Sequence, residues 1–171
     1  HSFPTRRSSD LLLCEKTDNK TAENFIHQMK YAPLYLDRKE ALDYFAKKNM
    51  SELAEGLKDK YAPLREYTLN KLAASKLAKD AAVIKAVEGI ANTEKDKKTK
   101  AAALDFLTQT TDAKYLALFK ANVNDSSYSV AGAALNGLAE LEPNNAYALA
   151  KKYSVDAKGD LGDAVDGIIM S

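Results

Sequence analysis

The chain has 171 residues, of which 46% are hydrophobic and 29% are charged. This composition is typical of a globular domain with a buried core and argues against a disordered chain. The formal net charge is +1, so there is no overall attraction toward nucleic acid or an anionic membrane. No apolar run approaches the roughly 20 residues of a membrane-spanning helix. The single cysteine, Cys14, has no partner for an internal disulfide.

Residues 1–11 read His-Ser-Phe-Pro-Thr-Arg-Arg-Ser-Ser-Asp-Leu and resemble the translation of a short-read sequencing adapter. We treat them as an artefactual leader and leave them out of the fold prediction. In that case we expect the true N-terminus to be missing. The alternative is a genuine polar leader that contains arginine.

Residues 11–16 form a short apolar run that ends in the turn formers Thr17-Asp18-Asn19. A run of this length suits a β-strand, although it is ambiguous between strand and helix. We predict a strand remnant and linker over residues 12–20. A helical domain is predicted over residues 21–171, and we expect it to be truncated at its C-terminus because the chain stops directly after an apolar run.

From Thr21 onward the hydrophobic pattern is helical. Thr21 is a candidate N-cap, and Asp37 and Glu40 have the spacing of a capping box for the next helix. The first apolar face consists of Phe25, Ile26 and Met29. The tetrapeptide Tyr-Ala-Pro-Leu occurs at residues 31–34 and again at 61–64, where proline is expected to end one helix just before the next begins.

A five-residue pattern recurs along the chain: a small residue, an aliphatic residue, Asp or Asn, a variable residue, and another apolar residue. The copies lie at 41–45, 68–72, 103–107, 134–138 and 164–168, with the small residue replaced by Thr in the second. Their aliphatic anchors are Leu42, Leu69, Leu104, Leu135 and Val165, so the steps are 27, 35, 31 and 30 residues. A helical period near thirty residues is typical of an α-solenoid. The sequence therefore predicts an all-α array of about five helix pairs, preceded by the short strand remnant.

Two pairs of glycines hold the same offsets from their anchors. Gly132 and Gly137 flank Leu135 as Gly162 and Gly167 flank Val165. Glycine weakens a helix interior by roughly 1 kcal/mol relative to alanine, so close approach of a neighbouring helix is the expected reason for all four.

The sequence offers little chemistry. His27 is the only histidine outside the leader, and with Cys14 it cannot supply the three or four ligands of a zinc site. No nucleophile–base pair or phosphate-binding loop is recognisable. We therefore predict no catalytic, cofactor-binding or metal-binding residue in this chain.

Three further features have a functional and a structural interpretation. The charged run from Glu94 to Lys100 could form a basic patch, but its mixed signs favour a solvated loop. Tyrosines 31, 44, 61 and 67 could form a stacking platform, but packing at the edge of the core is favoured. Asp43, Asn70, Asp105, Asn136 and Asp166 could bind cations, but hydrogen bonds to turns of the neighbouring repeat are favoured.

Two stretches resemble a known family. Residues 12–21, Leu-Leu-Cys-Glu-Lys-Thr-Asp-Asn-Lys-Thr, and residues 32–41, Ala-Pro-Leu-Tyr-Leu-Asp-Arg-Lys-Glu-Ala, resemble the segment after the β-sandwich domain of bacterial aminopeptidase N-type zinc metallopeptidases. In that family a catalytic domain and a β-sandwich precede a C-terminal domain of HEAT-like helical repeats. The resemblance covers roughly residues 12–171 and is sharpest over 12–48.

The resemblance implies a non-catalytic C-terminal domain that covers the active site of its parent enzyme, with zinc and the catalytic residues in upstream domains. Its partners would be the catalytic and β-sandwich domains of the same chain. The alternative is a free-standing HEAT-like scaffold that binds a peptide or protein along its concave face. A nucleic-acid binder is a third, less favoured possibility. Exposed apolar surface on residues 12–30 would favour the aminopeptidase hypothesis.

Overall fold

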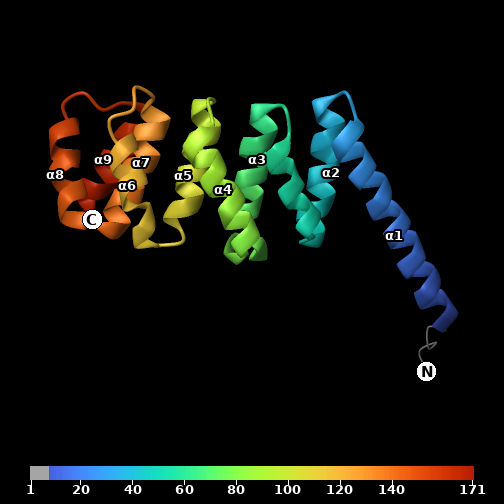
Figure 1. Ribbon diagram of the computed structural model, residues 1–171. Coiled ribbons are helices and arrows are strands. Elements are labelled where there is room, and N and C mark those ends of the chain that lie inside the picture. Colours follow the sequence, from blue (N-terminus) through green and yellow to red (C-terminus); the bar gives the residue numbers. More distant parts are fainter. Residues whose placement is uncertain (1–7) are drawn as a thin grey trace, which may run out of the picture.

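The helices of the chain lie side by side in a row of antiparallel pairs (Figure 1). The structure is a computed structural model that describes the backbone from residue 8 to residue 171 and the side chains from residue 19 onward. The row runs from α1, drawn in blue, to the pair of α8 and α9, drawn in orange and red. The predicted all-α fold is confirmed for this part of the chain.

Five successive helix pairs can be followed along the chain. The first pair is α1 (Ser8–Tyr31) and α2 (Tyr35–Lys48). The second is the 3-10 helix η1 (Ser51–Lys58) and α3 (Ala62–Ala73), followed by the short η2 (Lys76–Lys79). The third is α4 (Ala81–Thr93) and α5 (Lys97–Thr108). The fourth is η3 (Ala113–Tyr115) with α6 (Leu116–Asn122) and α7 (Tyr128–Leu141). The fifth is α8 (Pro143–Tyr153) and α9 (Gly159–Met170).

The core lies between the two helices of each pair and between the second helices of successive pairs. Helix α3 packs on α5, α5 on α7, and α7 on α9. The five aliphatic anchors are all at most 1% exposed: Leu42, Leu69, Leu104, Leu135 and Val165. The recurrent pattern therefore marks equivalent core positions in the second helix of each pair.

The predicted strand over residues 11–16 is wrong, because this run is part of helix α1. A strand needs a neighbouring strand for its backbone hydrogen bonds, and the described residues contain none. A helix satisfies these groups within itself, and the following Glu15, Lys16 and Lys20 are good helix formers. The N-cap predicted at Thr21 is wrong as well, since α1 continues through this residue.

The predicted capping box at Asp37 and Glu40 is also wrong. Helix α2 begins at Tyr35, with Leu34 as its N-cap residue and no side-chain cap. Arg38 explains this earlier start, because its Nη1 donates to the carbonyl oxygens of Ala32 and Pro33, both at 3.0 Å, and so holds the turn against the first turn of α2.

The two Tyr-Ala-Pro-Leu copies occupy different positions in their helix pairs. The first connects α1 to α2, as predicted, and its Leu34 is 63% exposed. The second enters α3, where Pro63 lies in the first turn and Leu64 is only 2% exposed. The leucine of the tetrapeptide therefore lies on the surface in the first copy and in the core in the second.

Close approach of a neighbouring element explains only two of the four repeated glycines. A Cβ on Gly132 would lie 2.6 Å from the carbonyl oxygen of Asp160 in α9, and one on Gly137 would lie 2.5 Å from the ring of Phe119. Close approach is thus confirmed at these two positions. At Gly162 the nearest atom would be 3.5 Å away, and at Gly167 there is nothing within 4 Å, so the prediction is wrong there.

Candidate interaction surface

The recurrent Asp and Asn residues lie on one face of the row, each beside a buried anchor. Asp43 is partly buried, and the other four are exposed: Asn70, Asp105, Asn136 and Asp166. We call this face of α2, α3, α5, α7 and α9 the ladder face.

Asp43 is hydrogen-bonded to the neighbouring pair, but by a side chain of helix α3 and not by a turn as predicted. The Tyr67 hydroxyl on α3 donates to its carboxylate, and Lys39 Nζ donates at 3.0 Å. Burial favours a higher pKa for Asp43, but the hydrogen bonds from Tyr67 and Lys39 outweigh burial and lower the pKa below its ordinary value. At the other four positions no side-chain hydrogen bond to a described residue is present, so the structural prediction is wrong there.

Two adjoining hollows open on the ladder face around Asp105. One has a volume of about 240 Å³ and lies over α3 and α5, and the other has about 360 Å³ and extends across α7 to α9. The residues that line both are Ala101, Asp105, Ser129 and Asp160. The space between neighbouring second helices is therefore accessible from this face.

Asp105 has an unusual electrostatic environment. The surrounding protein walls raise its pKa to about 6, and the nearby negative charge of Asp160 acts in the same direction. Asp160 itself accepts a hydrogen bond from the Ser129 hydroxyl. Near neutral pH, two carboxylates from α5 and α9 thus face the same hollow.

A third hollow of about 590 Å³ continues the ladder face over α7, α8 and α9 and shares Asn136, Gly167 and Ile168 with the second. We call the three hollows together the ladder groove. Its described lining residues include the carboxylates Glu66, Asp105, Glu140, Asp160 and Asp163, whereas Lys98 is the only cation among them. The groove therefore favours a positively charged ligand.

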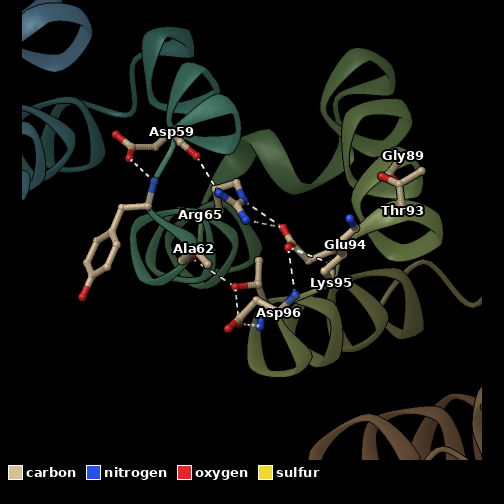
Figure 2. A network of polar contacts seen from close by, with 10 residues as sticks. Asp59, Ala62, Arg65, Gly89, Thr93, Glu94, Lys95 and Asp96 are labelled. Carbon is tan, nitrogen blue, oxygen red and sulfur yellow. Dashed lines mark hydrogen bonds and ion pairs between the residues drawn. The ribbon is translucent and has the colours of Figure 1, made fainter.

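A polar network joins the second and third helix pairs at the N-terminal ends of α3 and α5 (Figure 2). Arg65 donates to Glu94 Oε2 through Nε at 2.8 Å and to the carbonyl oxygen of Asp59 through Nη1 at 2.7 Å. Glu94 Oε1 in turn accepts from the backbone N–H groups of Lys95 and Asp96. The side chains of Glu94 and Arg65 are 9% and 19% exposed, so this is a partly buried ion pair.

The charged run 94–100 is therefore only partly the solvated loop that we predicted. The loop is limited to residues 94–96, because α5 begins at Lys97. Asp96 caps α5 by accepting from the N–H and the hydroxyl of Thr99, and that hydroxyl also bonds the carbonyl oxygen of Ala62, 3.1 Å away. The loop is short because the Arg65–Glu94 ion pair and the Asp96 N-cap hold its backbone from both sides.

The network belongs to a regular series that we did not predict from the sequence. Asp59, Glu94 and Asp125 each lie ten residues before an anchor, in the turn that enters a second helix. Their partners on the preceding second helix are Arg38 at 2.8 Å, Arg65 at 2.7 Å and Lys97 at 2.8 Å. Both arginines lie four residues before their own anchor, so a search for charged residues at fixed offsets could have found these contacts.

His27 and Cys14 do not come together in a site. His27 is exposed, with its ring 4.8 Å from that of Tyr31, and Cys14 lies in the part of α1 whose side chains are outside the described residues. Within the described residues there is no group of three or more His, Cys, Asp or Glu side chains that could hold a metal ion.

The four singled-out tyrosines divide into two kinds. Tyr44 stacks on Phe25, with ring centroids 4.4 Å apart, and Tyr67 bonds Asp43, so both pack at the edge of the core as predicted. Tyr31 and Tyr61 are 69% and 41% exposed, so the prediction is wrong for them. Both belong to the Tyr-Ala-Pro-Leu copies, whose turns hold the tyrosine outside the helix contacts.

No protein-family model matches the chain, and no curated protein is significantly similar to it. None of the described helices is both long enough and apolar enough to cross a membrane.

Proposed function

We propose that the row of helix pairs is a HEAT-like α-solenoid and that it is a non-catalytic C-terminal domain of an aminopeptidase N-type zinc metallopeptidase. Such an enzyme removes N-terminal residues from peptides. The observation that carries the proposal is the resemblance of residues 12–21 and 32–41 to the segment that precedes the helical domain in that family. In this chain the two stretches lie in α1 and around the turn into α2, directly ahead of four further helix pairs.

One feature supports the solenoid part of this proposal. The buried anchors recur once in every pair, as expected of stacked repeats in which each pair buries its apolar face against the next. The family resemblance alone assigns zinc and the catalytic groups to upstream domains of the parent. No step of the reaction is assigned to a residue of this chain.

The apolar surface expected for an aminopeptidase fragment does not lie on the described part of residues 12–30. Over residues 19–30 the large apolar side chains Phe25, Ile26 and Met29 are buried or partly buried. Exposed large apolar side chains begin at Tyr31, and those of residues 12–18 lie outside the described residues. This criterion therefore gives the proposal no support within residues 19–30.

Long-read sequencing of the source DNA across the Leu11–Leu12 junction tests the proposal directly. We expect the reading frame to continue upstream through a β-sandwich into a helix with a His-Glu-x-x-His motif and a later glutamate ligand. A start codon or a signal peptide immediately before Leu12 would contradict it. The matched control is a read through the downstream end of the gene, which is free of the adapter-like segment.

The ladder groove favours a second candidate, a free-standing scaffold that binds a basic protein segment along the ladder face. The groove crosses several helix pairs, and carboxylates far outnumber cations among its charged lining residues. The test is binding of an arginine-rich probe peptide to the wild type and to Asp160→Asn. An Asp112→Asn variant is the control, because Asp112 is exposed and lies away from the groove. Equal binding to wild type and Asp160→Asn would remove this candidate.

A further inference from the structure

Five large apolar side chains are exposed where α1 turns into α2 and where η1 turns into α3. They are Tyr31 at 69% exposure, Leu34 at 63%, Tyr35 at 45%, Leu36 at 59% and Tyr61 at 41%. The rings of Tyr35 and Tyr61 are 5.0 Å apart, which connects the first pair to the second. We call these five residues the tyrosine patch. Isolated exposed apolar residues are ordinary, but a cluster of them marks an interaction surface.

The leucines of the two tetrapeptides differ in exposure. Leu64, the counterpart of Leu34 in the second tetrapeptide, is 2% exposed and contributes to the core. The first tetrapeptide is held outward because Arg38 bonds the carbonyl oxygens of Ala32 and Pro33 and also pairs with Asp59. A buried arginine thus fixes the turn that presents Leu34 and Tyr35 to solvent.

Positive charge lies beside the tyrosine patch. A hollow of about 310 Å³ is lined by Tyr31 together with Lys30, Lys58 and Lys60. Arg38 and Asp59, which also line it, neutralise each other, and Glu55 is paired with Lys58 at 3.0 Å. Two of the lysines therefore remain in excess over the carboxylates that line the hollow.

We propose that the tyrosine patch docks a segment of another protein that carries an apolar side chain next to carboxylates. The apolar side chain packs against the Tyr35–Tyr61 pair, and the carboxylates pair with Lys30 and Lys60. Charge complementarity selects this partner, because apolar contact supplies affinity while opposite charges at the rim set specificity and the association rate. The surface is distinct from the acidic ladder groove and does not depend on the proposed function.

Fluorescence anisotropy with two labelled peptides tests this proposal. Both peptides share a central Leu-Trp-Leu, which is flanked by glutamates in one and by lysines in the other. We expect the acidic peptide to bind the protein and the basic peptide not to bind at the patch. Binding of the acidic peptide should weaken as salt is added, because exposed charge pairs are screened. Equal binding of the two peptides at the patch would overturn the proposal.

Variants locate the binding. Replacement of Tyr35 and Tyr61 by alanine should weaken binding of the acidic peptide by about tenfold or more, as for aromatic hot spots. Tyr128→Ala removes an exposed tyrosine on α7, 47% exposed, and should leave binding unchanged. The pair Lys30→Glu and Lys60→Glu should shift the preference to the basic peptide. An unchanged preference contradicts the proposal.

Two measurements distinguish docking of a partner from unfolding of a variant and from self-association. Circular dichroism melting checks that each variant is folded, and the uncharged Leu34→Ser replaces the tyrosine double variant if that one is unfolded, with a loss of binding again expected. Sedimentation velocity checks for self-association. If the wild type is a dimer that the tyrosine variant dissociates, the occupant is a second copy of this chain and the proposal is wrong.

Discussion

Ion pairs join the first three helix pairs, whereas small side chains in close contact join the last three. Arg38 reaches Asp59 and Arg65 reaches Glu94, and all of these side chains are at most 19% exposed. About half of the buried residues of α5, α7 and α9 are alanine or glycine, which allow the helix backbones to approach. The fully or almost fully buried small residues there include Ala103, Ala131, Ala134 and Ala164.

The position that carries arginine in the first two pairs changes along the chain. The residue four before the anchor is Arg38, then Arg65, then Lys100, and then Ala131, which is 1% exposed. The acidic partner is also absent at the last junction, where Val155 occupies the place of Asp59, Glu94 and Asp125 and is 84% exposed. The last junction therefore has neither partner of the ion pair, and the backbone of α9 instead lies close to Gly132.

Loss of one member of the most buried ion pair should have the largest effect on stability. Arg38→Met leaves Asp59 charged and almost fully buried, which should lower the free energy of unfolding by about 3–5 kcal/mol. The double variant Arg38→Met and Asp59→Asn should recover much of this loss, because no uncompensated charge remains. Urea unfolding monitored by circular dichroism measures the stability of the single and the double variant.

An exposed ion pair provides the control for this experiment. Lys58 and Glu55 are 72% and 44% exposed, so Lys58→Met should change stability by less than about 1 kcal/mol. Hydrogen exchange should show the Arg38→Met loss mainly in α2 and α3. A uniform loss of protection from α1 to α9 would mean that the two regions are not stabilised separately.

Close packing at the last junction should be the next most sensitive feature. In Gly132→Ala the new Cβ meets the backbone of Asp160, which cannot move aside easily, and we expect a loss of about 1–3 kcal/mol. Gly167→Ala is the matched control, since its Cβ meets no atom within 4 Å and a helical alanine is favoured by about 0.5–1 kcal/mol. Thermal melting should show a lower melting temperature for Gly132→Ala and a higher one for Gly167→Ala. Destabilisation by both substitutions would disprove a role for close contact at Gly132.

The third ion pair in the series should matter less. Lys97 is 48% exposed and Asp125 is 14% exposed, so Lys97→Met should lower stability by about 0.2–1 kcal/mol. The effect should shrink as salt is added, unlike that of Arg38→Met. A salt-independent loss of stability as large as that in Arg38→Met would contradict this, and would mean that the third and fourth helix pairs are joined by an ion pair of the same kind as the first three pairs.

Features set by the local sequence pattern could be predicted, whereas features set by contacts between residues far apart in the sequence could not. The anchors repeat at a helical period and are buried, so the all-α fold and the second helices could be predicted. The strand at residues 11–16 could not be excluded, because a short apolar run fits either structure. The exposure of Leu34 against the burial of Leu64 depends on the contacts of Arg38, which no local pattern reveals. On the ladder face, the pattern located the residues but not the hollows between the helices that surround Asp105.

The smallest expected effect concerns like charges in the close-packed region. The pKa of Asp105 is raised to about 6 from the ordinary 3.8 by its protein surroundings and by Asp160, so folding favours the protonated form. Stability should therefore increase as pH falls from above 6 toward 4, and Asp105→Asn should remove this part of the pH dependence. Glu66, Lys98 and Asp160 face the same hollow, so Asp160→Asn should lower the Asp105 pKa when it is followed by NMR titration. Solvent reaches the carboxyl and screens it, which keeps the effect small. An unshifted Asp105 pKa in the wild type would show that charge repulsion plays no part at this junction.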